Sequence, residues 1–176
     1  MHDTVVRLGD TFCTVRTLAE EDMEDLLAVK NGIETHRERF ELQKNGKACY
    51  LGAEMNGRVI GFVLISFDNK EDVMPYTNNE KCADMIDLFV MKSFRGKGIG
   101  AYLIAQSEKV CKENGISYLG LDVNPTDNLS AMRLYEKLSY EKVGELHLDG
   151  IYPSKDKNGN SCNYEDWCID MIKKLH

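Results

Sequence analysis

The segment Val90–Ala101 reads VMKSFRGKGIGA and joins an apolar stretch to an amphipathic one. It carries Gly96, Gly98 and Gly100, with Arg95 and Lys97 beside them. Glycines let the main chain approach a ligand closely, and the N-terminus of a following helix offers unpaired N–H groups with partial positive charge. The segment therefore predicts an anion cradle between a strand and a helix, of a size that fits a pyrophosphate.

Two phosphate-binding patterns can be compared with this turn. A P-loop requires Gly-x4-Gly-Lys-Ser/Thr, and it is excluded because Lys97 is followed by Gly98. The string Gly96-x-Gly98-x-x-Ala101 satisfies the dinucleotide-binding pattern, with Asp122 at the end of the next predicted strand. Residues 91–95 make this turn longer than that pattern normally has. A nicotinamide-dinucleotide enzyme is therefore kept as the alternative.

Hydrophobic periodicity and turn residues predict the elements on either side of this turn. Asn56-Gly57 between two apolar runs is the signal of a β-hairpin, and the stretch 17–20 has the form of a capping box. The predicted strands are 12–16, 50–55, 59–67, 84–91, 118–123, 140–148 and 166–172. The predicted helices run from the capping box to Gly32 and over 34–44, 98–113 and 128–138, with loops at 68–81 and 149–163.

The order β-α-α-β-β-β-α-β-α-β-β predicts an α/β (α+β) fold in one domain over 1–176. The front half reads as an antiparallel meander. The unit from Asp84 to Val123 is a βαβ crossover, whose two strands should be parallel. We expect a single mixed and twisted, largely antiparallel sheet of six to seven strands with helices on both faces.

Composition and charge narrow the class of protein. Among 176 residues, 22 are Lys or Arg and 29 are Asp or Glu, giving a net charge of −7, so binding to nucleic acid is not expected. No apolar run approaches the roughly 20 residues that span a bilayer, and the N-terminus shows no secretory signal. We predict a cytoplasmic protein whose six cysteines are reduced, buried and not paired with histidines in a metal site.

With its flanking elements, Arg95-Gly96-Lys97-Gly98-Ile99-Gly100 resembles the Gln/Arg-x-x-Gly-x-Gly/Ala signature of the GNAT superfamily of N-acetyltransferases. The segment Asn128–Leu138 resembles the Asn-x-x-Ala-x-x-x-Tyr helix of that superfamily. The order of strands and helices matches from Phe12 to Leu175. One departure is Ser139-Tyr140, where the family usually has Gly-Phe after this helix.

The resemblance implies an acetyl-CoA-dependent N-acetyltransferase with the GNAT fold, in which two strands splay at the acetyl-CoA site. The cradle would hold the pyrophosphate, the main chain of the preceding strand would pair with the pantetheine arm, and Asn128 would bond the pantetheine or the thiol end. Asn128 has an alternative role as a plain helix N-cap. The expected cofactor-binding residues are Phe89, Val90, Met91, Arg95, Gly96, Lys97, Gly98, Ile99, Gly100, Ala101 and Asn128.

Attack of an amine on a thioester needs a base, an oxyanion donor and a proton for the departing thiolate. A main-chain N–H near Val90 fits the oxyanion role, and Tyr135 fits the proton donor, with a core aromatic as its alternative. Asp84 and Asp122 are both candidates for the base, and each has the alternative of a solvated carboxylate at a strand end. Asp87, three residues after Asp84, is expected on the opposite face of the strand.

The acceptor pocket is expected from the helix 34–41 and the loops 68–81 and 149–163. These segments carry Glu34, Glu71, Asp72, Tyr76, Glu80 and Tyr152. Their acidity predicts a primary amine of a small molecule or peptide as acceptor, and the oligomeric state, a homodimer included, is left open. A third hypothesis is a non-catalytic acyl-CoA-binding domain, against which Tyr135 and Asn128 argue.

Overall fold

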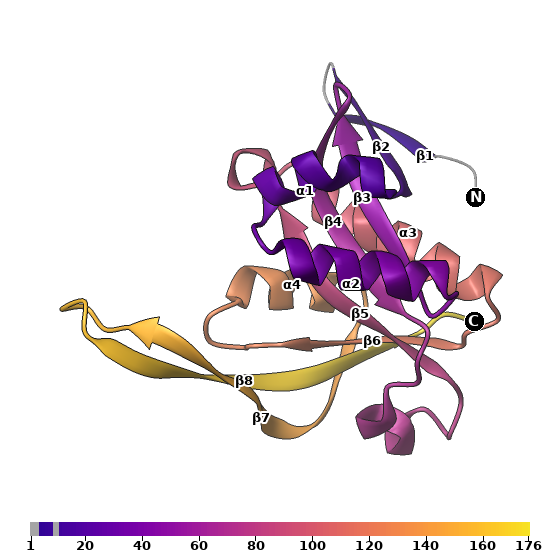
Figure 1. Ribbon diagram of the computed structural model, residues 1–176. Coiled ribbons are helices and arrows are strands. Elements are labelled where there is room, and N and C mark those ends of the chain that lie inside the picture. Colours follow the sequence, from indigo (N-terminus) through magenta and orange to yellow (C-terminus); the bar gives the residue numbers. More distant parts are fainter. Residues whose placement is uncertain (1–3, 9–10) are drawn as a thin grey trace.

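The computed structural model describes residues 4–8 and 11–176, which form one eight-stranded sheet in the order β1-β2-β3-β4-β5-β6-β8-β7 (Figure 1). The strands are β1 (Thr4–Leu8), β2 (Thr11–Thr17), β3 (Ala48–Met55), β4 (Arg58–Ser66), β5 (Cys82–Val90), β6 (Tyr118–Val123), β7 (Glu141–Lys155) and β8 (Ser161–Lys174). The α-helices are α1 (Met23–Val29), α2 (Ile33–Lys44), α3 (Ile99–Glu113) and α4 (Leu129–Lys137). Short 3-10 helices are η1 (Glu20–Asp22), η2 (Glu71–Tyr76) and η3 (Lys92–Phe94).

Helices cover both faces of the sheet, as predicted. One face carries α1 and α2 over an apolar cluster that includes Tyr50, Phe62 and Leu64. The other face carries α3 and α4 over the larger core, which includes Leu103, Leu119 and Tyr135. The parallel pair β5–β6, joined through α3, confirms the predicted crossover in an otherwise antiparallel sheet.

The sheet has one strand more than the six to seven expected. The additional strand is β1, which pairs with β2 at the edge of the sheet. Its sequence lacks the apolar alternation that predicts a strand. The expected loop 149–163 is also wrong, because β7 and β8 pair from Ile151–Glu165 out to Lys155–Ser161 in a long projecting hairpin (Figure 1). Cross-strand pairing therefore overrides the polar composition of this stretch. Cys162 lies exposed near the hairpin tip, whereas the other five cysteines are buried as expected.

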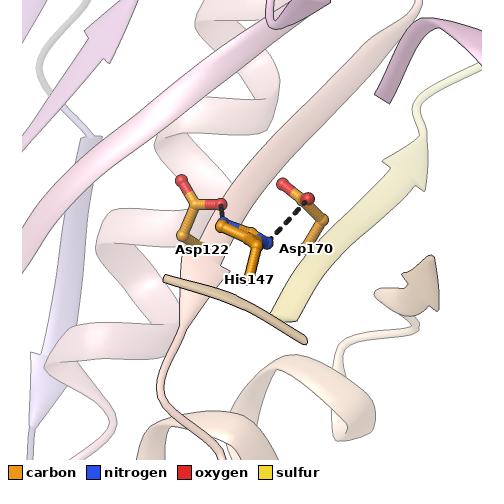
Figure 2. A group of neighbouring side chains, drawn as sticks. All are labelled: Asp122, His147 and Asp170. Carbon is orange, nitrogen blue, oxygen red and sulfur yellow. Dashed lines mark ion pairs between the residues drawn. The ribbon is translucent and has the colours of Figure 1, made fainter. Parts of the chain in front are cut away.

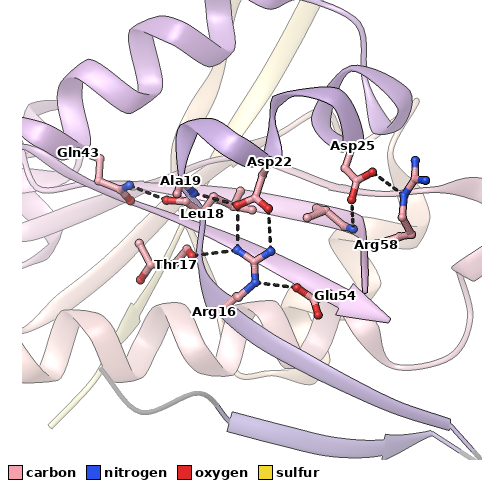
Figure 3. Close-up of polar contacts among 10 residues, drawn as sticks. Arg16, Thr17, Leu18, Ala19, Asp22, Asp25, Gln43, Glu54 and Arg58 are labelled. Carbon is pink, nitrogen blue, oxygen red and sulfur yellow. Dashed lines mark hydrogen bonds and ion pairs between the residues drawn. The ribbon is translucent and has the colours of Figure 1, made fainter. Parts of the chain in front are cut away.

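The first helical segment starts at η1, later than the capping box at 17–20 predicted (Figure 3). Thr17 belongs to β2, and the N–H of Ala19 donates to Asp22 Oδ2 at 2.9 Å instead. Arg16 of β2 donates to both oxygens of Asp22, at 2.8 and 2.7 Å, and to Glu54 of β3 at 2.7 Å. This bidentate pair fixes the start of the helical segment to the sheet.

Strands β5 and β6 separate after a short parallel pairing. Their register runs from Cys82–Tyr118 to Asp84–Gly120 and stops there. Just beyond, the register between β4 and β5 shifts between Phe62 and Leu64, and Asp87 takes a positive φ of 54°. A bulge of this kind bends the strand away from its neighbour. The expected splay between these two strands is therefore present.

The bulge also corrects the expected direction of Asp87. Asp84 pairs with Ser66 and lies on the face covered by α1 and α2, and Asp87 reaches that same face, where Lys30 and Arg39 bind it at 2.7 and 2.6 Å. Strict alternation would have sent residue 87 to the other face. The left-handed residue in the bulge breaks that alternation.

Candidate active site

The glycine-rich turn forms an open cradle at the start of α3. Gly96 and Gly98 have φ of 75° and 84°, a region that side chains rarely adopt, and Gly98 is the N-cap of α3. A Cβ built on either glycine would meet no atom within 4 Å. The first amides of a helix have no acceptor in their own helix, so this opening presents donors to an anion. The geometry fits the predicted pyrophosphate site.

The two cations of the turn lie against aromatic rings. The Arg95 guanidinium lies 5.3 Å from the centre of the Phe89 ring, and its Nε donates to the Val90 carbonyl at 2.8 Å. Lys97 Nζ lies 5.3 Å from the centre of the Phe94 ring. The Nε of Arg95 therefore holds the end of β5, and its two Nη atoms are the ones available to bind an anion.

The main chain at the end of β5, expected to receive pantetheine, already makes two hydrogen bonds. The Met91 N–H donates to Ile60 O at 2.9 Å, and the Val90 carbonyl accepts the Arg95 bond. Gly61 of β4 allows this close approach, since a Cβ there would lie 2.7 Å from the Phe89 carbonyl oxygen. The roles of Phe89, Val90 and Met91 stay predictions, and the Met91 N–H is the weakest candidate for the oxyanion donor.

Asn128 and Tyr135 lie at the two ends of α4. Asn128 is exposed and occupies the N-cap position of α4, where its carbonyl accepts the Met132 N–H at 3.0 Å, but its side chain makes no capping hydrogen bond. Tyr135 is 7% exposed within the large core, its ring 6.0 Å from that of Tyr140. Within residues 4–8 and 11–176, no group hydrogen-bonds the Tyr135 hydroxyl, and burial raises the pKa of Tyr135 to about 12. Tyr135 is thus a protonated, uncommitted donor at neutral pH.

Three carboxylates meet on the other face of the sheet, at the point where β5 and β6 part. They are Asp84 of β5, Asp122 of β6 and Asp170 of β8, gathered around Lys70 Nζ at 3.7, 2.7 and 3.1 Å. Asp122 and Asp170 are direct cross-strand partners, an arrangement of like charges that destabilises a sheet unless a cation intervenes. Lys70 is that cation, and only 8% of its side chain is exposed.

Asp84 lies in an environment suited to proton transfer, and burial also raises the pKa of the neighbouring Asp170. Burial, helped by the charges of Asp122 and Asp170 and opposed by Lys70, raises the pKa of Asp84 to about 6. The Oδ1 atoms of Asp84, Asp122 and Asp170 are all buried without a hydrogen-bond partner among the described residues. A carboxylate with a pKa near neutrality can both accept and release a proton at physiological pH. Asp122, by contrast, is committed to Lys70 at 2.7 Å.

His147 of β7 covers the same cluster from the solvent side (Figure 2). Its Nε2 lies 3.6 Å from Asp122 Oδ1 and its Nδ1 lies 3.7 Å from Asp170 Oδ2. The ligand-type atoms of this trio lie within 4.8 Å of one another, but the two ring nitrogens face different carboxylates and Lys70 already pairs with both. We therefore interpret the trio as an ion-paired cluster.

The expected acceptor segments differ in their contribution. The sheet-facing side of α2 forms a buried network, in which His36 Nδ1 lies 2.8 Å from the Tyr50 hydroxyl and Arg39 binds Asp87. Glu34, in contrast, is paired with Arg37 on the exposed side. η2 lies against β7, where a Cβ on Gly144 would lie 3.6 Å from the Tyr76 hydroxyl. Of the residues expected there, Glu71, Asp72, Tyr76 and Tyr152 are exposed, and Glu80 lies 3.4 Å from Lys174 Nζ.

Sequence reasoning missed Lys70, His147 and Asp170. Lys70 stands in a polar loop with nothing to distinguish it, and His147 follows a bulge in β7. Asp170 did carry a signal, because it interrupts the apolar run Ile169–Ile172 in a predicted strand. A buried charge in such a run is rare unless it is paired.

Comparisons with known proteins show the family of this chain. The model of the acetyltransferase (GNAT) family matches residues 15–140. An acetyltransferase of Pectobacterium atrosepticum is 34% identical over 139 residues, which are 79% of this chain and 87% of that protein. The chain therefore belongs to the GNAT acetyltransferase family, and its sheet and helices are the GNAT fold predicted from the sequence.

More distant similarities extend the comparison. An N-acetyltransferase of Methanocaldococcus jannaschii, described as uncharacterized, is 28% identical over 144 residues; the match spans 73% of this chain and 61% of that protein's length. The solved structure of a putative acetyltransferase from Salmonella typhimurium with acetyl-CoA has a TM-score of 0.65 and 16% identity, over 93% of this chain and 94% of that one. Across residues 4–8 and 11–176, no helix is long and apolar enough to cross a membrane.

Proposed function

We propose that this protein is an acetyl-CoA-dependent N-acetyltransferase that acetylates a primary amine by direct attack in a ternary complex. One observation carries the proposal: β5 and β6 part after Asp84, whose half-buried carboxylate lies on one face of the sheet, while the glycine turn at the start of α3 and Tyr135 lie on the other. The two substrates would therefore meet from opposite faces of the sheet. Family membership supports this assignment over the dinucleotide alternative.

Acetyl-CoA fits the site as the acyl donor. The open space at Gly96 and Gly98, the start of α3 and the terminal nitrogens of Arg95 suit a pyrophosphate. The Salmonella protein of similar fold was solved with acetyl-CoA, which supports the same co-substrate here. Asn128, exposed at the start of α4, is placed to bond the pantetheine or thiol end.

The chemistry divides between two side chains. Asp84 takes a proton from the ammonium form of the acceptor, directly or through a water, and the neutral amine attacks the thioester carbon. The carbon–sulfur bond then breaks, and Tyr135 gives its hydroxyl proton to the departing thiolate sulfur. The acetylated nitrogen loses its second proton to water, and a proton from water restores the Tyr135 hydroxyl. We assign the base to Asp84 rather than Asp122, because Lys70 holds Asp122 in a short ion pair.

A binding and turnover experiment tests the function. Calorimetry should detect acetyl-CoA or CoA and no NAD, and a panel of primary amines should release free CoA thiol in steady turnover. Binding of NAD alone would support the dinucleotide alternative. Binding of CoA without turnover on any amine of the panel would instead support the non-catalytic acyl-CoA-binding domain.

Substitution of Gly98 tests the cradle. Gly98→Val is expected to weaken acetyl-CoA binding by tenfold or more without unfolding the protein, because a branched side chain would fill the open space and disfavour a φ of 84°. Calorimetry with CoA measures the loss, and circular dichroism verifies the fold. A matched control is Gly46→Val, since Gly46 also has a positive φ, 69°, and open space but ends α2. Normal CoA affinity in Gly98→Val would place the cradle elsewhere.

Ionic strength tests the charge of the acceptor. The acceptor face carries Asp84, Asp122 and Asp170 with the exposed Glu71 and Asp72 of η2, so a cationic amine should be attracted. At saturating acetyl-CoA, kcat/KM for the amine is expected to fall about threefold to tenfold as salt rises to about 0.5 M, since screening shortens the range of the attraction. The variant Glu71→Gln/Asp72→Asn should show a shallower fall. Indifference to salt, or preference for an acidic acceptor, would overturn this choice of acceptor.

A further inference from the structure

We propose that Lys70 is a positioning residue for acetyl transfer: its ion pairs fix Asp122 and Asp170, and they leave Asp84 as the carboxylate that receives the acceptor's proton. The inference rests on the proposed function. It concerns a residue outside the glycine signature and outside the Asn128–Leu138 helix, in the loop that precedes η2.

The position of the Lys70 side chain is set by hydrogen bonds of its loop to β5 and by a glycine in β6. The Lys70 N–H donates to Cys82 O at 2.9 Å, and the side chain of Asn69 accepts the Cys82 N–H at 3.0 Å, so the loop is fixed to the start of β5. Gly120 of β6 leaves the room, because a Cβ there would lie 3.0 Å from Lys70 Cδ. The Lys70 side chain thus passes over Gly120 to the three carboxylates, and its main chain is held by hydrogen bonds to β5.

The ammonium group is shared unequally. It lies 2.7 Å from Asp122, 3.1 Å from Asp170 and 3.7 Å from Asp84. The two closer carboxylates are the cross-strand pair, whose mutual repulsion Lys70 relieves. Asp84 is left as the least tightly paired member, at the vertex where β5 and β6 part.

The charges of the cluster are consistent with Asp84 as the carboxylate that receives the proton. Three carboxylates face one lysine, so the cluster retains negative charge that a cationic acceptor can meet. The attraction of the carboxylates outweighs burial and keeps the pKa of Lys70 above its ordinary value, so Lys70 stays charged. The charge of Lys70 also lowers the pKa of Asp84 and limits the upward effect of burial. The groups that face Asp84 are Lys70 from the loop, Cys82 of β5, Asp122 of β6 and Asp170 of β8, with His147 of β7 contacting the last two (Figure 2).

The test uses Lys70→Met, read in two ways. Titration of the Asp84 carboxyl by ¹³C NMR in the protein without substrates should show its pKa rise by about one unit or more, as loss of a neighbouring opposite charge predicts. The acid limb of kcat/KM should move upward by the same amount, so that activity at pH 7 falls about tenfold and recovers at higher pH. Lys70→Arg should retain the wild-type pH profile. Lys109→Met, on the exposed side of α3, is the matched control and should change neither reading.

A second background keeps the test decisive if Lys70→Met does not fold. Asp170→Asn removes one carboxylate and should lower the Asp84 pKa, and adding Lys70→Met to it should raise that pKa again by about one unit. An Asp84 titration that is the same with and without Lys70 in either background overturns the inference. The titration needs no turnover, so an inactive wild-type enzyme would contradict the proposed function without deciding the role of Lys70.

Discussion

Asp84→Asn is expected to lower kcat by about 10²- to 10³-fold at pH 7 while acetyl-CoA affinity stays unchanged. The amide keeps the shape of the side chain but cannot take the proton, and general-base catalysis is worth about this much. In the wild type the rate should fall tenfold per unit below pH 6, because the pKa of Asp84 is raised to about 6 and the protonated acid is no base. Asp84→Asn should lack this limb.

Two further variants separate the base from its neighbours. Asp68→Asn, an exposed carboxylate close in sequence to the cluster, should leave kcat within about twofold of the wild type, as expected for a surface substitution away from the chemistry. Full activity in Asp84→Asn together with a large loss in Asp122→Asn would transfer the role of base to Asp122. The fold should survive Asp84→Asn, because Asp84 is the carboxylate farthest from Lys70.

Tyr135→Phe is expected to keep CoA affinity and to lose kcat by about 10²-fold. Only the hydroxyl is removed, and its proton is held firmly at neutral pH because burial raises the pKa of Tyr135 to about 12. No hydrogen bond within the described residues is broken, so the fold should be unaffected. Steady-state kinetics at saturating substrates, with calorimetry for CoA, measures the split between turnover and binding.

The neighbouring ring supplies a control for Tyr135. Tyr140 lies 6.0 Å away, centre to centre, and its hydroxyl donates to Glu108 at 3.2 Å. Tyr140→Phe should therefore cost about 1 kcal/mol of stability and leave kcat unchanged. An undiminished kcat in Tyr135→Phe at saturating substrate would show that Tyr135 is not the proton donor and acts only as an aromatic residue of the core.

Local signals made much of the fold predictable. The Asn56-Gly57 hairpin lies where expected, and strand β6 was predicted with its observed bounds, Tyr118–Val123. Glycines at 96 and 98 adopt the positive φ that their turn requires. Each of these signals is confined to a few neighbouring residues, so no knowledge of distant contacts was needed.

Long-range pairing explains the errors. The hairpin β7–β8 is polar and Gly-rich in the stretch predicted as a loop, and only the cross-strand register makes it a strand. Asp87 in the bulge is bound by Lys30 and Arg39, which lie 57 and 48 residues away in sequence. Neither the β7–β8 pairing nor the ion pairs of Asp87 can be recognised from the hydrophobic pattern of the strand sequence.

The sequence by itself determined the glycine cradle, the strand–helix order and the helix that carries Tyr135, because turn chemistry and hydrophobic period are local properties of the chain. Only the tertiary structure decided which of the acids pair closely with Lys70. Lys70 meets Asp122 across 52 residues of sequence, and Asp170 arrives from the last strand through its register with β6. Whether a carboxylate is a base or a partner in an ion pair depends on burial and on the nearest opposite charge, and both are set by the packing of distant segments.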